Sequence, residues 1–85
     1  MRGTGPVRWG NEVVYTFFTV DENVVNVRLS IDEADRLSVI EGVRVKITLP
    51  NHAVANLLVT AIVQEPPFVW VELAPSMPKH TDEVD

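Results

Sequence analysis

Residues 29–47, LSIDEADRLSVIEGVRVKI, decide the fold, because the pattern of a strand passes directly into that of a short helix and then, through Glu41 and Gly42, into that of a second strand. Ser30 and Glu33 have the spacing of a capping box, in which a serine hydroxyl and a glutamate carboxylate each accept a hydrogen bond from a backbone amide at a helix start. Apolar residues then recur every three positions, as on one face of a helix, until Gly42 interrupts the pattern. This segment predicts a helix of about two turns between two strands.

Extended segments lie on both sides of this unit. Residues 24–30 and 43–49 alternate apolar and polar side chains, which is typical of strands with one buried face. Residues 12–20, EVVYTFFTV, are rich in the β-branched and aromatic residues that favour strands, and a polar turn follows them as in a hairpin. Residues 54–64 and 68–73 are the remaining strand candidates. The first of these two shows little alternation, so we expect a central strand that is covered on both faces or curves through a barrel.

These segments predict one mainly β domain over residues 7–74, with the element order β-β-α-β-β-β. A chain with so little helix can cover its apolar faces only by curling its sheet or by pairing with a copy. We therefore expect a small five-stranded, mostly antiparallel barrel or curled sheet with one short helix. Residues 1–6 and 75–85 are rich in glycine, proline or acidic residues and are expected to be flexible tails.

Composition narrows the classes of function. The chain has 85 residues, 46% of them hydrophobic, and a formal net charge of -5. Such a charge repels a phosphate backbone, so nucleic acid is a disfavoured partner. The absence of cysteine fits a reducing compartment, and no stretch has the length or hydrophobicity of a signal or a membrane span, so we expect a cytoplasmic protein without a membrane partner.

Part of the chain is similar to known barrel families. The pattern consists of a small turn residue, an alanine, a leucine and a glycine before a valine-rich strand, at Ser30, Ala34, Leu37, Gly42 and Val45. In this pattern the segment resembles the strand-helix-strand unit of double-psi and swapped-hairpin (AbrB-type) barrels. Residues 46–73 also look like the end of a double-psi barrel such as the C-terminal domain of molybdopterin-dependent oxidoreductases.

The resemblance implies a barrel that is completed by a dimer, and either nucleic-acid binding or binding of a small molecule or cofactor. Ser38 and Val43 stand where these families usually have a glycine and an aspartate. Asp35 stands where the AbrB-type DNA-binding members often carry an arginine, which argues against DNA binding.

No group of residues has the pattern of a catalytic or metal site. His52, in a turn, has no acidic or imidazole neighbour in the sequence and is best explained as a surface residue. Asp32, Glu33 and Asp35 are explained by helix capping and by the helix dipole rather than by a cation. We therefore predict no catalytic residues, no metal, no cofactor and no enzymatic activity.

Four basic residues form the one group of charged side chains that could bind an anion. Arg28, Arg44 and Lys46 lie at outward positions of the strands before and after the helix, and Arg36 lies on the helix. If these two strands approach each other, the four would form a basic stripe. The alternative is an ordinary solvated surface on which acidic residues are interspersed.

The aromatic residues give the leading hypothesis. Phe68 and Trp70 share one face of the last strand, and if this strand lies at a sheet edge they form a contact surface for a second copy or another protein. Packing in the core is the alternative role. We therefore expect a non-catalytic interaction or assembly domain, acting as a homo-oligomer or as an accessory module. The alternatives are a dimeric nucleic-acid-binding regulator and a small-molecule or cofactor-binding barrel.

Overall fold

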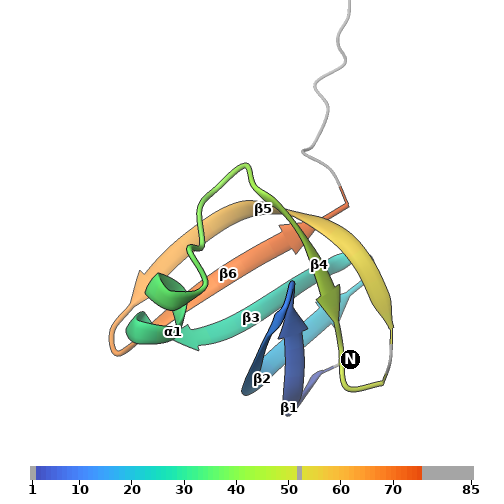
Figure 1. Ribbon diagram of the computed structural model, residues 1–85, viewed down its shortest axis with the longest axis horizontal. Coiled ribbons are helices and arrows are strands. Elements are labelled where there is room, and N and C mark those ends of the chain that lie inside the picture. The colour runs from blue at the N-terminus through green and yellow to red at the C-terminus, as the bar shows by residue number, and fades with distance from the viewer. Residues whose placement is uncertain (1, 52, 76–85) are drawn as a thin grey trace, which may run out of the picture.

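The computed structural model of the protein describes residues 2–51 and 53–75. This part of the chain contains six strands and one helix (Figure 1). The elements are β1 (Arg2–Trp9), β2 (Glu12–Asp21), β3 (Val24–Ser30), α1 (Ile31–Arg36), β4 (Arg44–Thr48), β5 (Val54–Glu65) and β6 (Phe68–Ala74).

The strands close into an antiparallel barrel in the order β1-β2-β3-β6-β5-β4. Closure depends on a short pairing of β1 with β4, where Arg8 lies opposite Thr48 and Trp9 opposite Ile47. Two strands separate β3 from β4 in either direction around the barrel, so these two strands lie on opposite sides of it. The α1 helix lies at the end of the barrel where β3 ends and β6 begins (Figure 1).

The expected mainly β barrel with one short helix is confirmed, but the expected number of five strands is wrong. The additional strand is β1, and its residues 2–6 belong to the segment that was expected to be a tail. Glycine and proline in this segment concealed the strand, because both weaken a strand pattern. Proline is tolerated at an edge, and β1 reaches β4 only through its last two residues. Residues 76–85 of the second expected tail lie outside the described part of the chain.

The capping box at the start of α1 is confirmed. The Ser30 hydroxyl accepts a hydrogen bond from the Glu33 amide at 3.1 Å, and the Glu33 carboxylate accepts one from the Ser30 amide at 2.9 Å. The helix ends well before Gly42, because Leu37 caps it and Ser38 takes a left-handed conformation with φ of 55°. A connecting segment over residues 37–43 therefore leads from α1 to β4.

The longest strand, β5, changes partner along its length. Its first half pairs with β4 and its second half with β6, and the register with β6 shifts between Val59 and Ala61. Before this irregularity, Leu57 to Val59 are all buried. Leu57 and Val59 belong to the core cluster, whereas Leu58 faces the other side of the strand and is covered there, which explains why the sequence does not alternate here. The expectation of a strand that curves through a barrel is confirmed.

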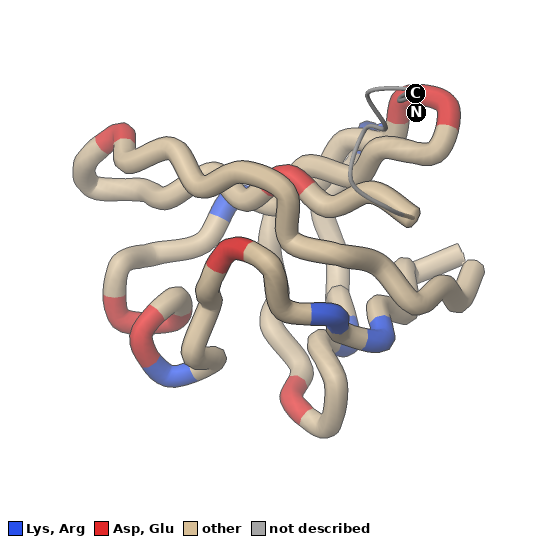
Figure 2. The backbone as a smooth tube through the Cα atoms, turned by 90° about the horizontal axis from the view of Figure 1, so that it is seen from above, with Lys and Arg blue, Asp and Glu red and all other residues tan. Residues whose placement is uncertain are grey.

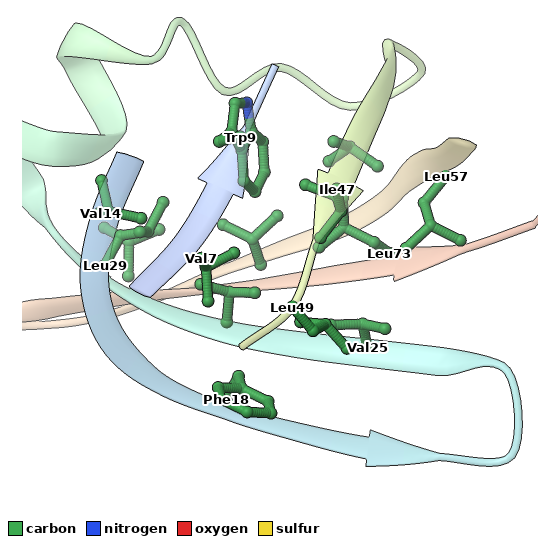
Figure 3. Packing of buried hydrophobic residues seen from close by; sticks show 14 residues of the cluster. Val7, Trp9, Val14, Phe18, Val25, Leu29, Ile47, Leu49, Leu57 and Leu73 are labelled. Carbon is green, nitrogen blue, oxygen red and sulfur yellow. The ribbon is translucent and has the colours of Figure 1, made fainter. Parts of the chain in front are cut away.

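The barrel interior is filled by apolar side chains from all six strands and from Leu49, which follows β4 (Figure 3). Trp9 closes one end beside Ile47, while Phe18 packs at the other (Figure 3). Thr16 is the one buried polar residue of the described part of the chain, and its hydroxyl donates to the carbonyl oxygen of Arg28. The interior of the barrel is therefore a packed apolar core.

Two glycines of β1 provide a matched test of the packing around this strand. A Cβ atom at Gly5 would lie 2.9 Å from the ring of Pro50, whereas one at Gly3 would lie in ordinary contact, 3.5 Å from the ring of Phe18. We expect Gly5→Ala to lower the free energy of unfolding by about 1 to 3 kcal/mol, because the rigid proline must move. Gly3→Ala is expected to change it by less than about 1 kcal/mol or to raise it. Urea denaturation of both variants checks this, and equal stability of the two would show that Pro50 does not pack on β1.

Candidate interaction surface

The outward positions of β2, β3 and β6 carry a cluster of aromatic residues around one arginine. The cluster consists of Tyr15, Phe17, Arg28, Phe68 and Trp70, and we call it the aromatic face. Val14, Thr16 and Phe18 of β2 point inward, so the alternation of the strand turns Tyr15 and Phe17 outward. Arg28 and Trp70 lie directly opposite each other on β3 and β6.

The Arg28 guanidinium and three rings of this face, those of Phe17, Phe68 and Trp70, are linked by contacts. The Arg28 Cζ atom lies 4.4 Å from the centre of the Phe68 ring and 5.5 Å from that of Phe17. The rings of Phe17 and Trp70 meet edge to face, with centres 6.0 Å apart and planes at 89°. Each cation-π contact is worth about 0.5 to 1 kcal/mol when exposed, and an edge-to-face pair has a similar value. These contacts stabilise the arrangement of these four side chains relative to one another.

Several apolar side chains of this region remain in contact with solvent. Tyr15 is 73% exposed and Phe68 is 37% exposed. Val63 of β5 lies opposite Trp70 and extends the apolar surface onto a fourth strand with 54% of its own surface exposed. Exposed apolar side chains on neighbouring strands form a larger apolar surface than the isolated exposed residues found on any protein.

The structure places Phe68 and Trp70 on one outward face, as the sequence predicts, but not at a sheet edge. The β6 strand pairs with β3 on one side and with β5 on the other. A partner therefore cannot add a strand beside β6 and would have to pack on the face of the sheet. The sequence does not indicate that Phe17 and Arg28 lie beside Phe68 and Trp70, because the pairing of β3 with β6 joins segments about 40 residues apart.

Charges on and beside the aromatic face are of both signs. Arg28 forms no ion pair within the described residues, where the single ion pair joins Arg36 to Glu12 at 2.6 Å. Glu72 lies two positions after Trp70 on β6 and accepts a hydrogen bond from the Thr60 hydroxyl at 2.7 Å. Glu65 lies opposite Phe68 at the end of β5. One cation and two carboxylates thus lie on or next to the same apolar surface.

The structure does not bring the four predicted anion-binding residues together. Arg28 lies on β3, while Arg44 and Lys46 lie on β4 at the opposite side of the barrel. Arg36 is paired with Glu12. The two strands that were required to approach each other for a basic stripe are therefore separated, and Figure 2 shows acidic segments distributed around the whole chain trace.

Other chemical features are few. Within the described residues no three histidine, cysteine or acidic side chains lie close enough to hold a metal ion. His52 lies outside the described part of the chain. The described helix is too short and too polar to cross a membrane.

Comparisons with protein-family models, with curated proteins and with solved structures give no match. Inferences about function therefore depend on the geometry of the chain itself.

Proposed function

We propose that this barrel is a non-catalytic association domain, and that the aromatic face is the surface through which two copies of the chain bind each other. The observation that carries the proposal is the Arg28 guanidinium between Phe17 and Phe68, on an exposed apolar surface that extends over four strands. The complete absence of cysteine further favours a reducing compartment such as the cytoplasm.

The residue types of the aromatic face are those that dominate binding energy at protein interfaces. Tryptophan, tyrosine and arginine are enriched among residues whose truncation costs about 2 kcal/mol or more. Here one of each lies within a single surface together with two phenylalanines. The existing contacts among them lower the entropy that binding would otherwise lose by fixing these side chains.

The charges on and beside the aromatic face favour a second copy of the chain as the binding partner. In a two-fold symmetric dimer the same patch lies on both sides of the interface, so the patch must be complementary to itself. Arg28 lacks a carboxylate partner within the described residues, and Glu65 and Glu72 lie near it on the same outer surface. Two such faces, rotated against each other, can place the arginine of each copy near a carboxylate of the other.

A substitution at Phe68 tests this function. Phe68→Ser is expected to weaken dimerisation about 30-fold, because it removes a central ring and the support for Arg28. Sedimentation equilibrium over a wide range of protein concentration measures the dissociation constant. Phe68 is partly exposed and lies outside the core, so the variant is expected to keep its fold.

Val54→Ser is the matched control, because Val54 is an exposed strand residue in the half of β5 that pairs with β4. It should leave the dissociation constant within about twofold of the original value. A protein that stays monomeric at all concentrations would overturn the proposal of a second copy. A dimer that Phe68→Ser and Val54→Ser weaken equally would place the interface elsewhere.

The two alternative functions have less support. A nucleic-acid-binding regulator of AbrB-like type needs several cations on one surface, and the four candidates are spread over both sides of the barrel. A cofactor-binding barrel needs an open interior, and this one is filled with side chains. An interaction with a different protein would use the same aromatic face and is compatible with a monomer in the sedimentation experiment.

A further inference from the structure

Three basic residues lie together on the outer face of β1 and β4. Arg44 and Lys46 are exposed and alternate with inward-facing residues of β4, and Arg8 is exposed between two buried residues of β1. Where the two strands pair, Arg8 lies opposite Thr48. The next pair continues with a hydrogen bond of 2.8 Å from the Gly10 amide to the Lys46 carbonyl oxygen, so Lys46 is a diagonal neighbour of Arg8 on the same face. We call Arg8, Arg44 and Lys46 the basic face.

The strand positions directly opposite the basic face carry no acidic side chains. On β2 and β5 these positions are occupied by Val13, Asn56 and Leu58. Glu41 lies three positions before Arg44, but the single ion pair of the described residues lies elsewhere, between α1 and β2. Three like charges on one face raise the free energy of the barrel unless an anion lies near them. The basic face is therefore a place where carboxylates would be stabilised.

The described part of the chain ends beside this face. Ala74, the last residue of β6, lies opposite Leu58 of β5, and Leu58 lies opposite Arg44 of β4. The Arg44 Nη1 atom donates a hydrogen bond to the carbonyl oxygen of Pro75 at 3.0 Å. The Arg44 side chain thus crosses the outer side of β5 to the point where the chain leaves the barrel.

The residues that follow Pro75 have a charge opposite to that of the basic face. Residues 76–85, which lie outside the described part of the chain, contain one lysine and three carboxylates, at Asp82, Glu83 and Asp85. Asp82 follows Pro75 by seven residues, and such a segment can span at most about 24 Å. The three cations lie closer together than this, because positions two apart in a strand are separated by about 7 Å and paired strands by about 5 Å. The carboxylates can therefore reach all three.

We propose that the basic face binds the acidic segment of residues 82–85 of the same chain. A short tether gives an effective concentration in the millimolar range, so that even weak contacts between exposed charges occupy the site for part of the time. In the bound form the carboxylates neutralise the three cations and cover this face against other polyanions. The basic face shares no residue with the aromatic face, so the contact does not depend on the proposed dimer.

Paramagnetic relaxation enhancement in the full chain tests the proposal. The chain contains no cysteine, so Thr81→Cys introduces a single site for a nitroxide beside the acidic segment and retains all three carboxylates. The NMR signals of the amides of Arg8, Lys46 and Thr48 are expected to lose about half of their intensity, as for a site of millimolar affinity at this effective concentration. A mixed sample contains nitroxide-labelled protein without an NMR isotope and isotope-labelled protein without a nitroxide. Its signals should keep their intensity, because the contact is within one chain.

Charge variants of the acidic segment separate binding from mere proximity to Pro75. The combined change Asp82→Asn, Glu83→Gln and Asp85→Asn keeps the tether and is expected to reduce the intensity loss at least about threefold. Lys79→Gln changes a charge of opposite sign in the same segment and should not reduce it. Raising the ionic strength from about 0.1 M to about 1 M shortens the screening length from about 10 Å to about 3 Å and should act like the neutralised variant.

Variants of the barrel locate the contact. Arg8→Gln combined with Lys46→Gln is expected to reduce the intensity loss at Thr48 at least about threefold, whereas Arg2→Gln, exposed at the other end of β1, should leave it within about 1.5-fold. Absence of any intensity loss, or an equal loss in the variant without carboxylates, would overturn the proposal. Loss that appears in the mixed sample to the same extent would also overturn it, because the segment would then bind a second copy.

Discussion

Removal of residues 2–6 is expected to unfold the protein or to leave it only marginally folded. These residues form most of β1, and they pair in register with β2 from Arg2 opposite Thr19 to Pro6 opposite Tyr15. Their loss would expose Phe18, on which Gly3 packs, and would leave β2 without its partner on that side. A chain of 85 residues has a total stability of only about 4 to 13 kcal/mol, and the five residue pairs between this part of β1 and β2 contribute a large part of it.

Circular dichroism and urea denaturation of the shortened chain measure this effect. The control is the full-length variant with Arg2→Ser and Thr4→Ser, because both side chains are exposed on β1 and the backbone pairing is retained. The control is expected to differ from the original protein by less than about 1 kcal/mol. If the shortened chain keeps the original urea midpoint, β1 does not belong to the cooperative unit and the segment behaves as the tail that the sequence predicts.

Local signals in the sequence predicted the elements near the helix correctly. Ser30 and Glu33 define the helix start by themselves, because a capping box joins residues three positions apart. The hairpin of β2 and β3 also follows from a short polar turn, in which Glu22 takes a positive φ of 58°. Interactions over such short separations leave a pattern that can be read without knowledge of the fold.

Long-range contacts left no such pattern. Gly5 looks like a flexible residue in the sequence, but it is buried, and the ring of Pro50 occupies the space where a side chain would lie. The separation of β3 from β4 depends on the return of β6 to β3, which no local pattern encodes. The predicted basic stripe required β3 and β4 to be neighbours, and in the barrel they are not.

The sequence predicted only part of the aromatic face, because it shows which residues share a face of one strand but not which strands pair. Phe68 and Trp70 are two positions apart in one strand, so their common face follows from strand geometry. Phe17 and Arg28 come from other strands and join them only through strand pairing. Alternation along β2 could have indicated that Phe17 and Phe18 face opposite sides, but consecutive aromatic residues do not show which of the two points inward.

Leu73→Ala is expected to lower the free energy of unfolding by about 2 to 5 kcal/mol. Leu73 is fully buried, with 0% of its surface exposed. On β6 it lies between Val25 of β3 and Val59 of β5, and both of these valines are buried as well. Truncation would therefore leave a cavity where three strands meet, and the paired backbones on both sides prevent the barrel from collapsing into it.

The size of this effect follows from the small size of the interior. A domain of this length buries only about 60 to 65% of its unfolded surface, so each core residue carries a large share of the stability. Because the free energy of unfolding falls by about 1 to 2 kcal/mol for each molar of urea, the urea midpoint of Leu73→Ala should fall by about 2 M. Val54→Ala removes the same kind of apolar group from an exposed strand position and should cost less than about 1 kcal/mol. Equal losses for the two variants would mean that Leu73 does not lie in a tightly packed core, because only a side chain surrounded by others leaves a cavity when it is shortened.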